Sequence, residues 1–392
     1  MSNYSYEKHF DVVIVGAGVI GCSIAYYLAK ESKGKLKVGV IDRTTIGEEA
    51  SSGAAGMLAA QIEAESQGSF LELAIASRNC FPALSQELKE ISGVDIEYIK
   101  SGICSVAFNA KQETELKNRM QEQKKMGLES VWLSKEEVLK KFPFLSPDLH
   151  GGFFVPEDGQ VSSSRLTLAF SEAAKKLGVE FFEEENFERI PLKEPGLNFI
   201  ETNLSKFSAE KFVIAAGAWT GHLLNGLAPV NPIKGQILIF QMSPSWIEKN
   251  QWNTPIYLGE IENPQQIVCY AVPKKDGHLI VGATAMDRGF DKSEDKEATE
   301  LMAEYICKVF PDSSHFPFKG FWAGLRPKSP DGKPVIGLVP GYKNIYVASG
   351  HFRNGILLSP ITGKIFADIF LKNSKEPEAF SPQRFLQSKA IA

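Results

Sequence analysis

The chain has 392 residues, 43% of them apolar and 23% charged, which is enough to bury the cores of about two or three ordinary domains. Lys and Arg total 43 against 47 Asp and Glu, and the net charge of −4 excludes a bulk field that would attract nucleic acid or anionic lipid. The cysteines are widely spaced and odd in number, which argues against a disulfide framework and indicates a reducing compartment: Cys22, Cys80, Cys104, Cys269 and Cys307.

The N-terminus is polar until its first short apolar run, and that run leads into glycines instead of a small-residue cleavage site. We therefore predict no signal peptide. No stretch approaches the roughly 18 uninterrupted apolar residues of a membrane helix, so we predict no membrane span. The expected location is the cytoplasm.

The first elements form a strand–helix–strand unit. FDVVIV predicts a strand over 10–15, helical spacing of apolar residues predicts a helix that ends at Gly34, and VGVI predicts a strand over 38–41 that leads to Asp42. The turn between the first strand and the helix carries a GxGxxG pattern made of Gly16, Gly18 and Gly21.

This pattern is typical of a dinucleotide site. Gly16 allows the tight turn, Gly18 lets a pyrophosphate approach the backbone, and Gly21 lets the helix pack on the sheet. The helix N-terminus favours phosphates, and Asp42 would accept hydrogen bonds from an adenosine ribose. The alternative, a glycine-rich turn without a ligand, is less favoured because the strand, the helix and the acidic residue all stand in the expected order.

The next part of the chain mixes loops, helices and short strands. Small residues predict a loop over 45–60, and helical patterns run from 69 to 92. Short strands are expected over 96–102 and 103–108, followed by a charged, solvated helix over 113–127.

A second Rossmann-like segment is expected from residue 151. It contains a helix that Gly178 ends, a strand over 179–183 and a buried strand over 211–217. Four strands then predict a mostly antiparallel sheet: 236–242, 266–272, 278–284 and 318–324. The last segment, 344–371, reads as a strand, a glycine-rich turn and a long apolar helix.

The predicted fold class is α/β, with a discontinuous Rossmann-like FAD-binding domain and a substrate domain that has a mostly antiparallel sheet and helices. We assign 1–92, 151–230 and 327–392 to the FAD-binding domain, and 93–150 and 231–326 to the substrate-binding domain. This discontinuity favours FAD over NAD, whose enzymes usually run through consecutive βαβ units. The turn at 350–356, GHFRNGI, would place a helix N-terminus near the flavin N1–C2=O edge.

Several segments together resemble the glycine oxidase family of the thiamine-pathway type, within the D-amino-acid oxidase and sarcosine oxidase group. The resemblance covers about residues 10 to 372 and is carried by VVIVGAGVIG, SSGAAGML, FVIAAGAW, YAVPKKDGHLIVGAT, GFWAGLRPKSPDGKPVIG and SGHFRNGILLSPITG. It implies FAD-dependent oxidation of glycine, sarcosine or small D-amino acids to an imine that hydrolyses to a keto acid. It also implies reduction of O2 to hydrogen peroxide, and a homotetramer.

The resemblance also implies residue roles. Arg326 and Tyr270 match positions that hold the substrate carboxylate, Arg353 matches an arginine near the flavin, and Met57 matches a methionine facing the flavin region. The chain departs from the family at the expected substrate pocket, where it has Val268, Ala285 and Met286. The segment after Arg326–Pro327 contains no cysteine, so the FAD is expected to be non-covalent.

The expected cofactor contacts come from the glycine turns, the end of the second strand, the loop of small residues and the GHFRNGI turn. They are Gly16, Gly18, Val19, Ile20, Gly21, Asp42, Arg43, Ser51, Ser52, Gly56, Met57, Ala216, Gly217, Trp219, Gly350, His351, Arg353, Asn354, Gly355 and Ile356.

The chemistry of an amino acid explains why these residue types suit the task. The Arg326 guanidinium can hold a carboxylate through two parallel hydrogen bonds, and the Tyr270 hydroxyl can add a third. The alternatives are a structural salt bridge for Arg326 and a core position for Tyr270. Arg353 could serve the flavin, the substrate or its own turn. His351 is more often structural at such a place, and we assign no general base because solvent can take the amine proton.

Other catalytic patterns are absent from the sequence. The six histidines form no metal-spaced pair, no CxxC occurs, and no GxSxG precedes a helix, so no metal site is predicted. Two other functions stay open at this point. One is a D-amino-acid or sarcosine dehydrogenase that passes electrons to a quinone or carrier, and the other is a non-catalytic FAD-binding scaffold protein.

Overall fold

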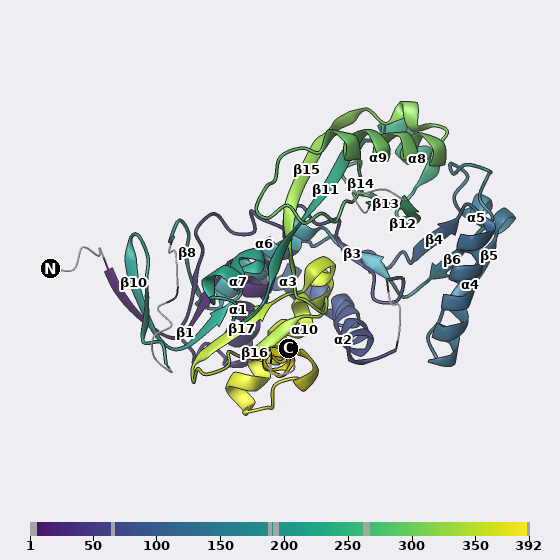
Figure 1. Cartoon of the computed structure of the whole chain (residues 1–392). Helices are drawn as coiled ribbons and strands as arrows, with labels where there is room; N and C mark the ends of the chain where they lie inside the picture. Colours follow the sequence, from purple (N-terminus) through teal and green to yellow (C-terminus); the bar gives the residue numbers. More distant parts are fainter. Residues whose placement is uncertain (1–5, 64–66, 187–189, 191–195, 262–266, 390–392) are drawn as a thin grey trace.

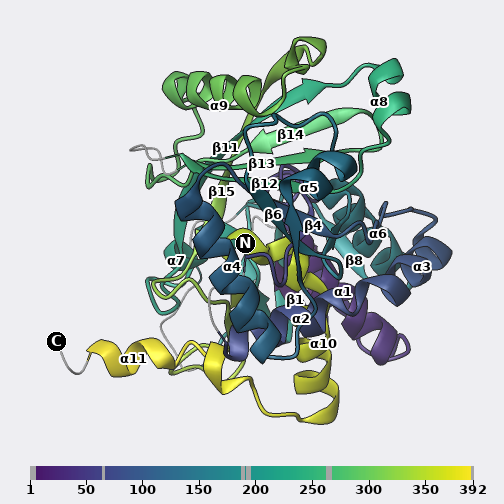
Figure 2. The same cartoon turned by 90° about the vertical axis from the view of Figure 1, so that its right-hand side faces the viewer.

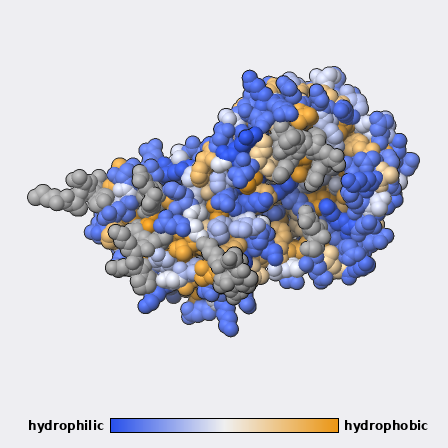
Figure 3. All heavy atoms as spheres, in the orientation of Figure 1, coloured by the Kyte–Doolittle hydropathy of each residue, from blue (hydrophilic) through white to orange (hydrophobic). Residues whose placement is uncertain are grey.

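The computed structural model describes the chain except for residues 1–5, 64–66, 187–189, 191–195, 262–266 and 390–392. Residue 266, the first of the strand predicted over 266–272, lies outside the described residues, as do the first five residues of the polar N-terminus. Two large sheets lie side by side, with a cluster of helices against each (Figure 1). The face seen in Figure 3 is mostly hydrophilic, with hydrophobic residues in small groups.

The first sheet is built around the predicted strand–helix–strand unit. Strand β1 (Tyr6–Val15) pairs in parallel with β10 (Ser205–Ile214) on one side and β2 (Val38–Ile41) on the other. The sheet order is β16-β17-β10-β1-β2-β8, and β9 pairs with β10. The other strands of this sheet are β8 (Glu180–Phe182), β9 (Phe199–Glu201), β16 (Val335–Leu338) and β17 (Ile345–Ser349). Both faces of the central strands are buried, which explains their unbroken apolar runs.

Helices cover one face of this sheet. The glycine-pattern helix α1 (Val19–Glu31) packs against α6 (Ser163–Lys176) and α10 (Gly355–Lys372), and their apolar side chains form one core with the strands. By length and composition alone, residues 352–372 could cross a membrane, but 56% of that window is buried inside the protein. This burial is also found in core helices of soluble proteins.

The second sheet has the order β15-β11-β14-β13-β12-β4-β6-β5. Neighbouring strands in this sheet run antiparallel, except that β12 and β4 are parallel to each other. The strands are β4 (Ile103–Ala107), β5 (Val131–Ser134), β6 (Gly151–Val155), β11 (Asn231–Gln241), β12 (Ile256–Ile261), β13 (Ile267–Pro273), β14 (His278–Gly282) and β15 (Phe318–Lys328). The expected mostly antiparallel sheet is confirmed.

Helices also lie beside the second sheet (Figures 1 and 2). They are α4 (Ala110–Lys125), α5 (Lys135–Lys141), α8 (Pro244–Asn250) and α9 (Lys296–Val309). The remaining elements are β3 (Met57–Leu58), which pairs with β7 (Gly159–Gln160), and the short helices α7 (Thr220–Leu223) and α11 (Arg384–Lys389).

The helical patterns over 69–92 are confirmed as two helices, α2 (Ser69–Arg78) and α3 (Phe81–Ser92), which are separate because Pro82 cannot continue a helix and is tolerated only in a first turn. The structure corrects two other local predictions. Residues 96–102 form no strand and contribute only an isolated bridge from Ile99 to Gln160.

The second correction concerns β6, which was expected to open the second Rossmann-like segment. It pairs instead with β4 along its whole length and with β5 on its other side in the second sheet, because strand partners elsewhere in the chain decide its place. The return to the first sheet therefore starts at α6. The division into FAD-binding and substrate-binding domains stays a prediction. Its boundary at residue 151 implies that β6 joins the first sheet, whereas β6 lies in the second sheet.

Candidate active site

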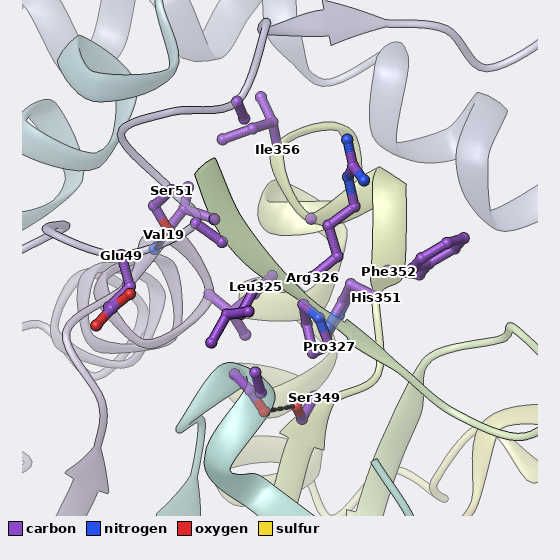
Figure 4. Close-up of a pocket in the computed structure, with 18 of the residues that line it drawn as sticks. Val19, Glu49, Ser51, Leu325, Arg326, Pro327, Ser349, His351, Phe352 and Ile356 are labelled. Atoms are coloured by element: carbon purple, nitrogen blue, oxygen red, sulfur yellow. Dashed lines mark hydrogen bonds between the residues drawn. The ribbon is translucent and has the colours of Figure 1, made fainter. Parts of the chain in front are cut away.

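A cavity of about 560 Å³ lies between the two sheets. Its lining comes from the β1–α1 turn, the ends of β2 and β10, the loop at 49–57, strand β15 and the turn before α10. Figure 4 shows Ser51, Arg326 and His351 around this space, which segments far apart in the sequence enclose.

One end of the cavity is formed by the glycine pattern and Asp42. Ala17 N donates to Asp42 Oδ2 at 2.6 Å, and the backbone and hydroxyl of Thr44 donate to Oδ1 at 2.9 and 3.1 Å. Burial raises the pKa of the Asp42 carboxyl, while these hydrogen bonds oppose the rise. The carboxylate keeps about one acceptor site for a further donor, because an ionised carboxylate has about four and three are taken.

The structure brings most predicted cofactor contacts together. Those that line the cavity are Gly16, Gly18, Val19, Ile20, Asp42, Arg43, Ser51, Gly56, Met57, Ala216, Gly217, Trp219, His351, Arg353, Asn354, Gly355 and Ile356. Gly21, Ser52 and Gly350 are outside the lining. Gly21 packs on the backbone of Gly16, the Ser52 hydroxyl donates to carbonyls of its own loop, and Gly350 packs against Val335.

The residues at this cavity fit FAD. Helix α1 begins at the cavity with Gly18 as its N-cap, and Val19 N donates to the Ser51 hydroxyl at 2.9 Å. The next amides of this first turn can face phosphate oxygens. Buried His351 Nδ1 has no hydrogen-bond partner among the residues that the structure describes, and His351 lines the same cavity. Its Nε2 is 3.0 Å from Thr362 Oγ1, and burial lowers the pKa of His351 to about 3, so the ring stays neutral at physiological pH.

Arg326 extends from β15 into the cavity (Figure 4). Its Nη1 donates to the Thr284 carbonyl at 2.7 Å, and its guanidinium interacts with the Tyr270 hydroxyl. Within the described part of the chain, no carboxylate lies within 4.0 Å of this guanidinium. Burial lowers the pKa of Arg326, but an arginine stays charged in proteins, so this half-buried cation still needs an anion.

A second charged group faces Arg326 and Tyr270 in the cavity. Arg353 Nη2 is 3.6 Å from Glu63 Oε1, and the Tyr257 hydroxyl donates to the same oxygen. Burial lowers the pKa of Arg353, but Glu63 and the two tyrosines outweigh this effect and raise it. Burial is also the largest cause that raises the pKa of both tyrosine hydroxyls. The site therefore presents two cations and one carboxylate.

Glu63 and Tyr257 are site residues that no sequence pattern predicted. Glu63 follows the loop of small residues, but no spacing pattern separates it from the acidic residues around it. Tyr257 lies in a strand that the sequence analysis did not predict. Its position opposite Tyr270 on the neighbouring strand is a consequence of sheet pairing.

The predicted substrate-pocket residues are only partly brought together. Met57 lines the cavity, whereas Val268, Ala285 and Met286 do not. Val268 shares a strand face with Tyr270 but lies two residues farther toward the β12–β13 hairpin, about 7 Å along the strand. Met286 is buried beside β11, where its backbone pairs with Lys234, and Ala285 precedes it on this segment.

Two residues that follow β14 contact residues that line the cavity at its Asp42 end. Lys292 Nζ lies 3.1 Å from Glu49, and the exposed Phe290 stacks on Trp219 with ring centroids 5.4 Å apart. Glu49 and Trp219 both line the cavity. We expect Phe290→Ala to weaken FAD retention about threefold to tenfold, since an aromatic pair contributes roughly 0.5–1.5 kcal/mol. Flavin fluorescence during dialysis measures this, with Phe318→Ala as the exposed-phenylalanine control.

Gly235 leaves room for the Arg326 guanidinium. A Cβ at this position would lie 2.2 Å from Arg326 Nη1 and 2.3 Å from Cζ. Because the guanidinium is the end of a flexible side chain, Gly235→Ala should displace it with little loss of stability. We expect the KM for an amino-acid substrate to rise roughly 10-fold or more, as misplaced positioning groups commonly cause. An unchanged KM together with a lowered melting temperature would contradict this expectation.

Comparisons with known proteins agree with this geometry. The family described as FAD dependent oxidoreductase (DAO) matches residues 11–369. The chain is 35% identical over 389 residues to the glycine oxidase of Bacillus subtilis (strain 168), covering 98% of this chain and 99% of that protein. It is 34% identical over 378 residues to the bifunctional protein ThiO/ThiG of Synechocystis sp., covering 96% of this chain and 54% of that protein. The crystal structure of glycine oxidase from Geobacillus kaustophilus matches with a TM-score of 0.86 and 33% identity, over 96% of this chain and 99% of that one.

Proposed function

The chain belongs to the family of FAD-dependent oxidoreductases that includes the glycine oxidases, and from that premise we propose that it oxidises glycine and other small amino acids. Sarcosine and small D-amino acids are the other expected substrates. The observation that carries this proposal is the half-buried Arg326 guanidinium beside Tyr270, which has no carboxylate within 4.0 Å among the described residues and faces a dinucleotide cavity.

The proposed reaction converts glycine, O2 and water into glyoxylate, ammonia and hydrogen peroxide. FAD, when bound, supplies the two-electron acceptor for this oxidation. The protein would hold the substrate so that its Cα–H bond faces the cofactor at close range. An imine forms as two electrons and two protons leave the Cα–N unit, and water then hydrolyses it.

The charged groups of the cavity are complementary to a small zwitterion. Arg326 and the Tyr270 hydroxyl would bind the carboxylate through charge-assisted hydrogen bonds. Glu63, the carboxylate that contacts Arg353 and Tyr257, would face the ammonium end. Neutral His351 has no suitable charge for either end, and we propose that solvent takes the amine proton.

Finer parts of the proposal rest on the resemblance and the relatives. We propose O2 as the electron acceptor, a non-covalent FAD, a homotetramer in the cytoplasm, and a role in thiamine biosynthesis. The similarity to a protein named ThiO/ThiG supports the last of these. The segment after Pro327 offers no cysteine for a covalent flavin bond.

A substrate panel with a peroxide readout tests the proposal. The holoprotein is assayed in air with glycine, sarcosine, D-alanine and D-proline, and glycine is expected to give hydrogen peroxide and glyoxylate in equal amounts. Flavin bleaching without peroxide, together with reduction of an artificial quinone, would instead indicate a dehydrogenase. Bound flavin that no amine bleaches would indicate a scaffold protein.

Glu63→Gln should selectively weaken recognition of the amine end. The variant keeps the shape of the side chain but loses the charge that faces the ammonium, and we expect kcat/KM for glycine to fall roughly 10-fold to 100-fold, as a charged hydrogen bond of about 1.5–3 kcal/mol implies. Inhibition by acetate, which has no amine, should change less than about threefold. Equal losses for glycine and acetate would show that Glu63 acts on the whole site instead.

A further inference from the structure

Glu63 reaches the cavity from a short segment that a buried polar network holds. The backbone amides of Gln61 and Ile62 both donate to the Asp158 carboxylate, at 3.1 Å and 2.9 Å to Oδ2. Asp158 is fully buried, and Arg78 Nη1 lies 2.8 Å from its Oδ1. The same Nη1 donates to Gln61 Oε1 at 2.6 Å.

The other side of this segment is fixed by helix α4. Gln123 Nε2 donates to the Gln61 carbonyl at 2.7 Å, and Arg119 Nη1 donates to the Ile62 carbonyl at 2.8 Å. Gln61 and Ile62 thus have both their amides and both their carbonyls bonded by side chains from other elements. Since no regular secondary structure holds this segment, these side chains set its position.

The segment carries two groups to the candidate active site. The buried Ile62 side chain belongs to the apolar cluster that contains Tyr257 and Tyr270. The next residue is Glu63, whose carboxylate contacts Arg353 and the Tyr257 hydroxyl. A shift of the 61–62 backbone would therefore move the carboxylate relative to Arg353.

We propose that the buried Arg78–Asp158 pair is a positioning device that holds the Glu63 carboxylate against Arg353 and Tyr257 at the cavity. Arg78 and Asp158 themselves do not line the cavity, so they act through the segment at 61–63. This inference rests on the proposed function in one respect, namely that Glu63 faces the amine end of the substrate.

The location of the pair supports this role beyond a general contribution to stability. Arg78 ends α2, Asp158 precedes β7, and Gln123 lies on α4, so three elements distant in sequence meet at one short segment. Burying an ion pair is seldom favourable compared with apolar packing, and its best-attested use is to fix one arrangement. Here the arrangement that it fixes is the approach of Glu63 to the site.

A double-mutant cycle in the FAD-loaded protein tests the proposal. Asp158→Asn should lower kcat/KM for glycine, whereas the same change in a Glu63→Gln background should have an effect at least about fivefold smaller, because coupled residues are not additive. A purely structural pair would lower kcat/KM by the same factor in both backgrounds, and that result would overturn the proposal. Asp331→Asn, which breaks the Arg–Asp pair with Arg384 outside the cavity lining, is the matched control and should leave kcat/KM unchanged.

Two further measurements keep the test informative if Asp158→Asn destabilises the fold. In Arg78→Gln/Asp158→Asn the uncompensated buried charge is gone, so the melting temperature should recover while kcat/KM stays low. Hydrogen exchange needs no turnover: the amides of Gln61 and Ile62 should exchange at least about 10-fold faster in Asp158→Asn, with other segments unchanged. Unchanged exchange in this segment would refute the positioning role. If the wild type oxidises no amine but Asp158→Asn still shows the faster local exchange, only the proposed function is refuted.

Discussion

Replacing Arg326 by alanine is expected to reduce kcat/KM for glycine roughly 10²-fold to 10⁴-fold while FAD stays bound. The guanidinium is half-buried and has no carboxylate within 4.0 Å in the described part of the chain, so the substrate carboxylate would be its counter-ion. Breaking a buried ion pair by removing one partner costs roughly 3–5 kcal/mol, which gives this loss. Steady-state kinetics on protein of known flavin content measures it.

Two control variants show whether the loss is specific. Arg326→Lys keeps the charge but cannot form two parallel hydrogen bonds with one carboxylate, so its kcat/KM should lie between those of the wild type and Arg326→Ala. Arg384→Ala removes an arginine that pairs with Asp331 at 2.8 Å outside the cavity lining, and it should behave like the wild type. Normal kinetics of Arg326→Ala would remove the basis for the proposed substrate site.

Replacing Gly16 by alanine is expected to abolish FAD binding. Gly16 has a φ of +110°, and a Cβ at this position would lie 2.4 Å from the Ala215 carbonyl oxygen. Because that oxygen belongs to a backbone segment next to the parallel pairing of β10 with β1, it cannot move without shifting the turn that faces the cavity. The purified variant should lack the absorbance of oxidised flavin even when FAD is supplied in excess.

Gly178→Ala is the matched control for Gly16→Ala. Gly178 also has a positive φ, of +93°, but nothing lies within 4 Å of a Cβ built there. Both variants share the backbone strain of about 1 kcal/mol or more that an alanine has at positive φ, and only Gly16→Ala adds the clash. The control should therefore bind FAD normally. A Gly16→Ala protein that kept its flavin would show that the turn does not shape the cofactor site.

The sequence predicted the parts of the fold whose signals are local. The β1–α1–β2 unit could be predicted because its apolar runs, glycines and Asp42 are close together in the chain. The helical patterns over 69–92 were predicted from local periodicity as well, and Pro82 lies in the first turn of the second of the two helices. The placement of β6 could not be predicted, because its sheet is decided by the pairing partners that β4 and β5 supply.

The residues of the candidate site also fall into two groups, those that a sequence motif predicted and those that only the fold brings together. Arg326 and Tyr270 were found through motifs, and the structure places both in the cavity lining, although their roles stay predictions. Glu63 and Tyr257 could not be found, since their contact joins residues 194 positions apart. Val268 was assigned to the pocket through the resemblance, but it lies two residues beyond Tyr270 toward the hairpin and outside the cavity lining.

The most direct test of the central claim compares glycine with glycinamide, which has the same amine and Cα–H bonds but a neutral amide in place of the carboxylate. If Arg326 binds the carboxylate, the wild type should prefer glycine by roughly 10²-fold or more in kcat/KM, the scale expected for a charge-assisted bidentate contact. In Arg326→Ala this preference should fall to within about threefold of unity. A preference that is just as large in the variant would contradict the account, because the carboxylate would then be recognised elsewhere.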